Sequence, residues 1–214
     1  ELIALENELA APKTNEYGRV DRVAAWMLLA KLYLNAEVYI GTPKYTEALT
    51  YLNKVIASGY SIDPVYSNIF TADNHLSPEI IFPICFDGQN TQGNGGMTFV
   101  LHASNGGGMP LNGIDGGWGG IRSISTFVEK FGAVEADFTD AEPEFPGIPD
   151  KRGMFYHKPE NWTWDITNVG NFTHGIGSTK FKNISSTGGA APNVHPTFAS
   201  TDFPALRLAD AYLM

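Results

Sequence analysis

The feature that most constrains this chain is a helical pattern near its start that is apolar on two faces. One face begins after Gly18 and comprises Val20, Val23, Ala24, Met27 and Leu28. The second face comprises Trp26, Leu29, Ala30 and Tyr33. A helix with two apolar faces needs packing partners on both sides, as in a layered array of helices. The pattern predicts one helix that ends near Tyr39, before Gly41.

A second helical pattern follows directly. Thr42 is a suitable N-cap with Pro43 at the first helical position, and Gly59 is a suitable C-terminal glycine. The apolar face between them comprises Tyr45, Ala48, Leu49, Leu52 and Ile56. Two antiparallel helices of this kind are similar to a tetratricopeptide unit, which cannot cover its own apolar faces. We therefore expect neighbouring units, and residues 2–9 look like the end of one.

The chain changes character after Tyr60. Residues 88–120 hold twelve of the 23 glycines and a single charged residue, Asp115. We expect a long irregular loop there, and loops longer than about 12–15 residues are usually functional or disordered. Short strands are expected at 80–86 and 180–184, and a short helix at 124–131. A last helix is predicted to begin at Asp202 or Pro204 and to run off the end of the chain, which indicates a fragment.

Composition excludes several classes of protein. The 14 Lys and Arg stand against 23 Asp and Glu, a formal net charge of -9 without basic runs, which argues against nucleic-acid or anionic-membrane binding. Because the chain has a single cysteine, Cys85, an internal disulfide framework is ruled out. We predict that Cys85 is a small buried residue. The longest apolar run, residues 23–30, is too short to span a bilayer. The chain begins at Glu1 without a signal sequence, which leaves open a segment removed from the parent protein.

Catalytic and metal-binding patterns are missing from the sequence. There is no nucleophile elbow, phosphate loop or complete dinucleotide motif, and the five histidines are scattered as expected of surface or loop residues. Asp137, Asp140 and Glu142 lie in an acidic stretch that could offer oxygens to Ca²⁺, but a solvated loop is the favoured interpretation. The same carboxylates permit a glycosidase pair without predicting one. We predict no cofactor and no metal.

Tryptophans in irregular sequence are the best positive signal. Trp118 lies among glycines, and Trp162 and Trp164 alternate with polar residues. An indole can stack on the C–H face of a sugar ring while side chains such as those of Asn112, Asp115 and Arg122 bind its hydroxyls. The alternative is that each tryptophan anchors its loop to the core. The six candidate ligand-binding residues are Asn112, Asp115, Trp118, Arg122, Trp162 and Trp164.

Several segments, in order along the chain, resemble the SusD/RagB family of outer-membrane glycan-binding lipoproteins. Residues 18–34 and 45–60 are similar to the helical-repeat pair of that family, and 77–82 to its Glu-Ile-Ile-Phe element. Residues 150–152 look like its Asp-x-Arg segment, 180–183 like its Lys-Phe-basic element, and 202–210 like the start of a further helix. The family is much longer, so the chain resembles a middle portion.

The resemblance implies a mainly α fold, with tetratricopeptide-like helix pairs, a large irregular region and a few short strands. It implies one domain over residues 1–214, divided into a helical-repeat portion at 1–60 and a loop-rich ligand-binding portion at 61–214. The implied function is non-catalytic oligosaccharide binding at the surface of a Gram-negative bacterium. A SusC-like TonB-dependent transporter would be the partner, and a lipid anchor outside this chain would hold the protein at the outer membrane. A peptide-binding helical scaffold is the alternative, and a glycoside hydrolase ranks last.

Overall fold

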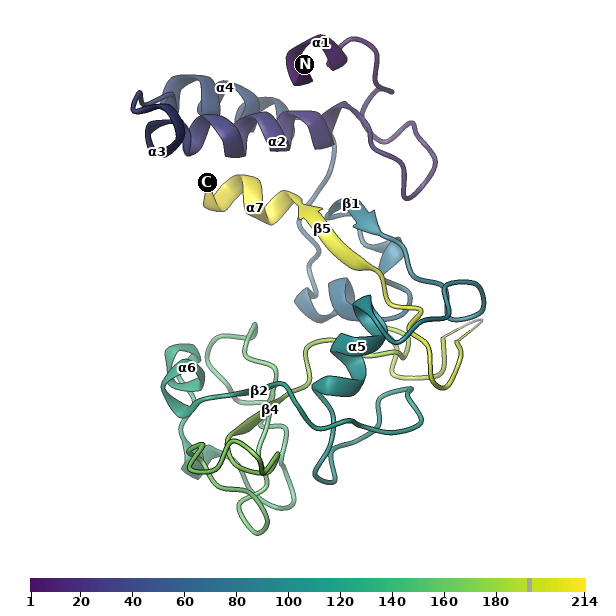
Figure 1. The fold of residues 1–214 in the computed structure, drawn as a ribbon, viewed down its shortest axis with the longest axis vertical. Helices are drawn as coiled ribbons and strands as arrows, with labels where there is room; N and C mark the ends of the chain where they lie inside the picture. Colours follow the sequence, from purple (N-terminus) through teal and green to yellow (C-terminus); the bar gives the residue numbers. More distant parts are fainter. Residues whose placement is uncertain (192–193) are drawn as a thin grey trace. The chain divides into compact units, whose positions relative to one another are not determined.

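The computed structural model describes residues 1–191 and 194–214, which form two compact units (Figure 1). The first, which we call the helical unit, comprises residues 1–65, 75–85 and 203–214. The second, the loop unit, comprises residues 66–74 and the described part of 86–202. Both units are discontinuous in sequence, because the chain leaves the helical unit after Val65 and returns to it twice.

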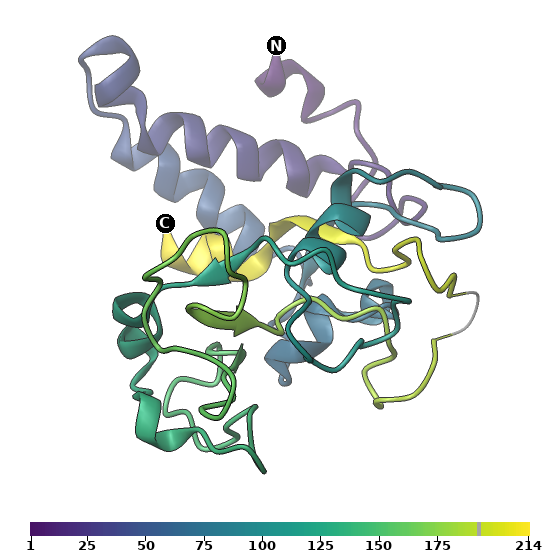
Figure 2. The same cartoon turned by 60° about the horizontal axis from the view of Figure 1, so that its bottom comes forward.

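The helical unit is built on two helices that lie side by side in both ribbon views (Figures 1 and 2). Its helices and strands are α1 (Leu2–Leu5), α2 (Arg22–Leu34), α3 (Ala36–Ile40), α4 (Tyr45–Ile56), β1 (Ile80–Ile84), β5 (Phe203–Arg207) and α7 (Leu208–Leu213). The short 3-10 helix η2 (Asn74–Leu76) precedes β1. The predicted helix pair is therefore present, whereas its kinship to a tetratricopeptide unit stays a prediction.

The ends of the two main helices differ from the predicted ones. The Asp21 carboxylate caps α2 by accepting hydrogen bonds from the first-turn N–H groups of Val23 at 2.8 Å and Ala24 at 3.3 Å. The helix ends at Leu34 rather than near Tyr39, because Asn35 leaves helical geometry and a separate turn, α3, follows. Thr42 and Pro43 do not start α4, which begins two residues later with Lys44 at its N-cap position.

The core of the helical unit lies on one face of α2. Its buried members are Val23, Ala24, Met27, Ala30, Leu52, Val55, Ile81, Leu206, Leu208 and Ala211. The opposite face of α2 is not covered within the described residues of this unit: Leu28 is 44% exposed and Leu32 is 48% exposed. Both predicted faces contribute buried residues, Val23, Ala24 and Met27 from the first and Leu29 and Ala30 from the second, whereas Leu28 of the first face is exposed.

The predicted last helix begins later than expected. Residues 203–207 form β5, which pairs antiparallel with β1 so that Ile80 lies opposite Arg207 and Ile84 opposite Phe203. The Arg207 guanidinium donates to the buried Glu79 carboxylate at 3.1 Å, and helix α7 begins only at Leu208. The strand forms by pairing with a segment far away in the sequence, since Ile80 precedes its partner Arg207 by 127 positions. Helical periodicity carries no information about such a contact.

The loop unit has short elements around three small clusters of buried side chains. They are η1 (Tyr66–Phe70), α5 (Gly96–Ala103), β2 (Arg122–Ser123), α6 (Ser125–Val128), η3 (Glu129–Phe131), η4 (Glu135–Asp137), β3 (Phe155–Tyr156) and β4 (Ile176–Ser178). The strands form one antiparallel sheet in the order β2-β4-β3. The short helix expected at 124–131 is confirmed as α6 and η3, which end at Gly132 in the left-handed region.

Two predictions for the loop unit are wrong. The strand expected at Lys180–Ile184 is absent, and the strand in this part of the chain is β4, which occupies the centre of the sheet. The segment 88–120 is not wholly irregular, because α5 lies within it. That helix forms because Met97 and Leu101 are buried against Ile114 and Ala199, a long-range cluster that outweighs the helix-breaking glycines around it. The mainly helical, loop-rich class with a few short strands is otherwise confirmed.

Candidate functional site

The glycine-rich segment after α5 folds back on the end of that helix. The backbone N–H of Trp118 donates to the carbonyl of His102 at 2.8 Å, and that of Gly120 donates to the carbonyl of Ala103 at 2.8 Å. A side chain at Gly117 would collide with the backbone carbonyl of Asn105, so glycine is needed for this close approach. The backbone therefore holds Trp118 in place without a regular element of its own.

Trp118 forms a half-exposed aromatic platform. One face of its indole stacks on the His102 ring at a centroid distance of 4.6 Å and an interplanar angle of 19°. Phe99 lies beside it at 6.2 Å and is itself 49% exposed. Trp118 is 47% exposed, which matches one covered face and one face open to solvent. The arrangement can hold a flat, partly apolar ring against the open face.

His102 supports the platform from below. It is 1% exposed, its Nδ1 lies 2.5 Å from the carbonyl oxygen of Gly116, and its Nε2 lies 2.7 Å from that of Thr197. A neutral imidazole donates through one nitrogen only, so the tautomer decides which of the two carbonyls accepts a hydrogen bond. Through these contacts the ring joins the glycine-rich segment to the segment at 195–198.

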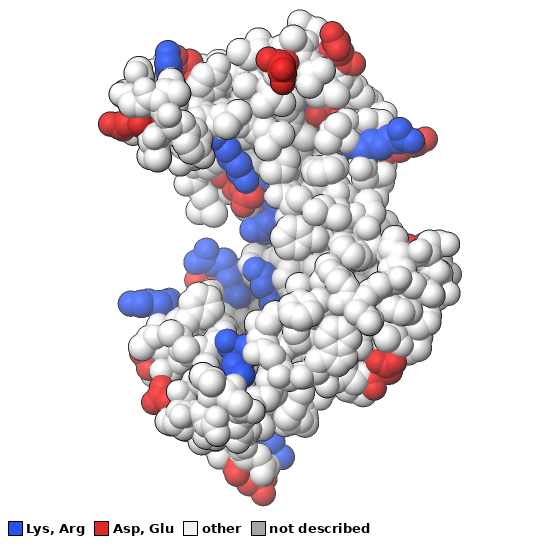
Figure 3. All heavy atoms as spheres, viewed as in Figure 1, with Lys and Arg blue, Asp and Glu red and all other residues white. Residues whose placement is uncertain are grey.

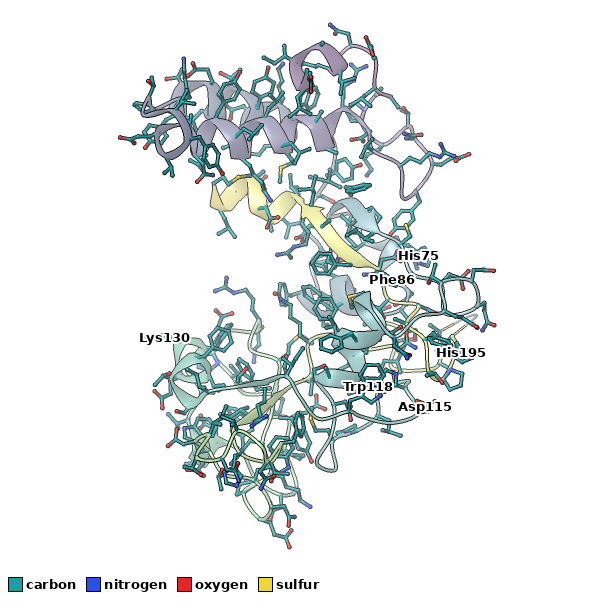
Figure 4. All side chains as sticks on the ribbon, in the orientation of Figure 1. His75, Phe86, Asp115, Trp118, Lys130 and His195 are labelled. Carbon is teal, nitrogen blue, oxygen red and sulfur yellow. The ribbon has the colours of Figure 1, made fainter. Side chains whose placement is uncertain are left out.

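Asp115 lies at the same junction. Its carboxylate accepts a hydrogen bond from the Thr197 hydroxyl at 2.5 Å, and its backbone N–H donates to the carbonyl of Pro196 at 2.7 Å. His195 orders the following turn by accepting the N–H of Thr197 at 3.0 Å. Asp115, Trp118 and His195 lie on one side of the loop unit (Figure 4). Because Asp115 is exposed, it can accept hydrogen bonds from a ligand beside the platform.

Asn112 and Arg122 have structural partners. Asn112 adopts a left-handed conformation with φ of 52°, and its carbonyl accepts the N–H of Asn183 at 2.8 Å. The Arg122 guanidinium donates to the carbonyls of His174 and Val169, the latter at 2.8 Å, and so ties down a neighbouring loop. The proposal that either residue binds a hydroxyl gains no support from these contacts.

Trp162 and Trp164 serve as loop anchors. Trp162 is 4% exposed and donates its indole N–H to the carbonyl of Gly107 at 3.1 Å, so no face of the ring is free for a sugar. Trp164 is half-buried and packs against Phe138 at 5.8 Å and His157 at 5.3 Å. The prediction of sugar stacking is therefore corrected for Trp162, and Trp118 is the one of the three with a broad open surface.

The acidic stretch is structured by local hydrogen bonds. The Asp137 carboxylate accepts the N–H of Val134 at 2.8 Å, and that of Asp140 accepts the N–H of Glu160 at 3.0 Å. Within the described residues, no group of three or more His, Cys, Asp or Glu could hold a metal ion. These contacts give the calcium interpretation of Asp137, Asp140 and Glu142 no support.

Several residues differ from their predicted surroundings. His102 and His157 are buried rather than at the surface, because each packs against aromatic rings, and Cys85 is exposed rather than buried. Sequence reasoning missed His102, Phe99 and Thr197 as parts of the site. The apolar run at 97–103 was the available signal for the helix that carries the first two.

No helix of residues 1–191 or 194–214 has the length and apolar character needed to cross a bilayer.

Fold and site together define a mainly helical, loop-rich protein with an exposed aromatic platform. No model of a known protein family matches the chain. The chain is 33% identical to the starch-binding protein SusD of Bacteroides thetaiotaomicron over 247 aligned residues, which cover 100% of this chain and 44% of SusD. The chain is similar to SusD over its whole length, and it spans less than half the length of this relative.

Solved structures agree with this similarity at the level of the fold. A SusD superfamily protein from Parabacteroides distasonis superposes with a TM-score of 0.65 at 18% identity, covering 99% of this chain and 42% of that protein. Another, from Bacteroides vulgatus, gives 0.62 at 17% identity, covering 99% of this chain and 38% of that protein. The expectation that the chain resembles a portion of a longer family member is confirmed.

Proposed function

We propose that this chain is part of a non-catalytic protein that binds oligosaccharides through the Trp118 platform. The observation that carries the proposal is the half-exposed indole, supported from below by His102 and bordered by the exposed carboxylate of Asp115. An aromatic face beside a hydrogen-bond acceptor is the combination that sugar rings require, since they present C–H groups on one face and hydroxyls at the edge. The name of the relative, a starch-binding protein, makes a linear glucan the first ligand to test.

The family supplies the wider setting of the proposal. The parent protein would lie on the surface of the outer membrane of a Gram-negative bacterium, held by a lipid anchor. It would deliver oligosaccharides to a SusC-like TonB-dependent transporter. Co-purification of the full-length parent with that transporter tests this part, and a parent that never retains the transporter contradicts it.

Binding of a linear glucan is tested by calorimetric titration of the chain with maltoheptaose and a panel of other oligosaccharides. A tryptophan of about 250 Å² that is 47% exposed offers about 115 Å² to a ligand. A sugar ring that covers half of this area contributes about 1.5 kcal/mol, so Trp118→Ala should weaken binding by roughly tenfold. Trp118→Phe keeps an aromatic ring stacked on His102 and should lose less affinity for the glucan than Trp118→Ala.

The matched control is Tyr39→Ala, which removes another exposed aromatic side chain, 64% exposed, from the helical unit. Its affinity for the glucan should equal that of the wild type. Thermal unfolding of each variant separates a loss of binding from a loss of folding. Equal affinities of wild type and folded Trp118→Ala would remove Trp118 from the site, and a full-length parent that binds no glycan would refute the function.

A peptide-binding or protein-binding role is the second candidate, and one observation favours it. The uncovered face of α2 borders an apolar hollow of about 600 Å³, whose lining includes Leu28, Leu32, Tyr39 and Met214. Exposed apolar surfaces of this kind mark contact sites for other proteins. Leu28→Asp would weaken capture of a protein partner and leave glucan affinity unchanged, which distinguishes the two roles.

A further inference from the structure

A cavity of the loop unit, separate from the Trp118 platform, combines positive charge with aromatic walls. It has a volume of about 240 Å³, and its lining contains two cations, four aromatic rings and two serine hydroxyls but no carboxylate. This is unusual for a chain with 23 acidic and 14 basic side chains. Lysine and arginine side chains gather on the side of this unit that also carries Lys130 (Figures 3 and 4). None of the residues of the Trp118 platform lines this cavity.

Lys180 is the first of the two cations. Its ammonium nitrogen lies 4.4 Å from the centroid of the Phe70 ring and 5.6 Å from that of the Tyr66 ring. The residue is half-buried, and no carboxylate of the described residues forms an ion pair with it. Aromatic faces stabilise a cation only in part, and a partly desolvated ammonium gains most from an anion. The position of Lys180 therefore favours an anionic ligand.

Arg152 is the second cation, and Asp150 fixes its direction. The Nε of Arg152 donates to Asp150 Oδ1 at 3.0 Å, and its Nη2 donates to Oδ2 at 2.6 Å. These hydrogen bonds lower the pKa of Asp150 to about 2, so the carboxylate stays charged at neutral pH. The remaining nitrogen, Nη1, has no acceptor among the described residues, and the side chain is 59% exposed. A guanidinium held on one edge by Asp150 can bind an oxyanion with the other.

Phenylalanine rings form the apolar wall of the cavity. Phe127 is 49% exposed, and its ring is held edge to face by Phe131 at 5.2 Å and Phe155 at 6.0 Å. The hydroxyl of Ser123 lies in the same lining. A volume of about 240 Å³ is below the range of roughly 300–1,000 Å³ typical of drug-sized ligands. The space suits one small ring with one charged group.

We propose that this cavity is a second ligand site, which binds a single acidic sugar ring through its carboxylate or sulfate group. Lys180 and Arg152 bind the oxyanion, the open ring of Phe127 receives the apolar face of the sugar, and Ser123 offers a hydroxyl to its edge. That the ring is a sugar rests on the proposed function, whereas the oxyanion follows from the cavity alone. The site would allow the protein to distinguish acidic from neutral glycans.

The test is calorimetric titration of the whole chain with D-galacturonate, with D-galactose and with sodium sulfate. Galacturonate should bind one site, at least about tenfold more tightly than galactose, and more weakly as salt rises. Lys180→Gln and Arg152→Gln should each weaken galacturonate binding by about tenfold or more, whereas Lys180→Arg should restore part of it. Lys158→Gln, which removes the same charge from a position of intermediate exposure outside the cavity, is the matched control.

The results separate this inference from the proposed function. Equal affinities for galacturonate and galactose, or equal affinities in Lys180→Gln and Lys158→Gln, overturn the acidic-sugar site and leave the Trp118 platform untouched. Sulfate that binds as tightly as galacturonate overturns the sugar part. Retained galacturonate binding in Trp118→Ala supports a separate site. If Trp118→Ala no longer binds galacturonate while Lys180→Gln binds it as tightly as the wild type, galacturonate binds at the Trp118 platform and the inference is overturned.

Discussion

The capping carboxylate of Asp21 provides a quantitative test of how the helical unit is held together. The side chain is 2% exposed and accepts four hydrogen bonds. Oδ1 accepts the two N–H groups at the start of α2, while Oδ2 accepts the N–H of Lys13 at 2.9 Å and the hydroxyl of Tyr60 at 3.1 Å. One carboxylate thus joins the start of the main helix to two other segments.

The expected cost of Asp21→Ala follows from these contacts. Loss of an N-cap costs about 1 kcal/mol, and loss of a hydrogen bond to a charged group costs about 1.5–3 kcal/mol. Because the contacts share one side chain and do not add fully, we expect a total of about 3 kcal/mol. At roughly 2–4 °C per kcal/mol, this corresponds to a melting temperature about 6–12 °C lower. Asp21→Asn keeps the cap but places an amide donor opposite the N–H of Lys13. Its loss of stability should therefore be smaller than that of Asp21→Ala but still measurable.

The assay is urea and thermal unfolding followed by circular dichroism at the helical band, which α2 and α4 dominate. The control is Glu8→Gln, which removes a carboxylate from an exposed position of the same unit and should change stability by less than about 0.5 kcal/mol. The account of the cap is refuted if Asp21→Ala has the same urea midpoint and melting temperature as Glu8→Gln. It is also refuted if Asp21→Asn is less stable than Asp21→Ala.

Two further predictions concern pH. Burial, with Asp21 adding to it, raises the pKa of Tyr60, so the folded state keeps a proton that the unfolded state loses above about pH 10. Stability should be constant below that pH and fall above it, with a shallower fall in Tyr60→Phe. Burial lowers the pKa of His157, against the opposing effect of Glu135 at 3.6 Å from Nε2. Because the unfolded state takes up this proton first, stability should fall as pH drops below about 6.5, and His157→Leu should reduce that slope.

Stability against pH, measured by urea unfolding at fixed ionic strength, tests both predictions. Alkaline slopes that are equal in wild type and Tyr60→Phe would contradict the first. Since neither ring nitrogen of His157 has a hydrogen-bond partner among residues 1–191 and 194–214, His157→Leu removes no hydrogen bond within them and is a fair probe of the second. An acid slope that persists unchanged in that variant would assign the proton uptake to another group.

The success of sequence-based prediction depended on the range of the contacts involved. Helices α2 and α4 were predictable because side chains three and four positions apart share a face, and a left-handed glycine, Gly41, ends the helical turn between them. Residues 203–207 carry the pattern of a helix start but form strand β5, because they pair with β1, whose residues lie 119 to 127 positions earlier. Helix α5 was missed because the surrounding glycines concealed the apolar run that buries Met97 and Leu101.

The candidate site shows the same division. Loop tryptophans could be singled out from sequence, but not which of them would be exposed. Trp162 is buried because its indole packs against Phe172 and bonds to Gly107, 55 positions earlier. Trp118 keeps an open face because His102 covers only the other. His102 itself could not be assigned to the site, since its support depends on the carbonyl of Thr197, 95 positions later.

By itself, the sequence determined the helix pair, the family resemblance and the glycine-rich setting of Trp118, because each rests on residue types and spacing along the chain. Only the tertiary structure decided that Trp118 is a supported platform, that Trp162 is a core anchor, and that Arg152 and Lys180 line one cavity. The physical reason is that exposure and charge pairing depend on which distant segments cover a side chain. Those contacts exist only after the chain has folded.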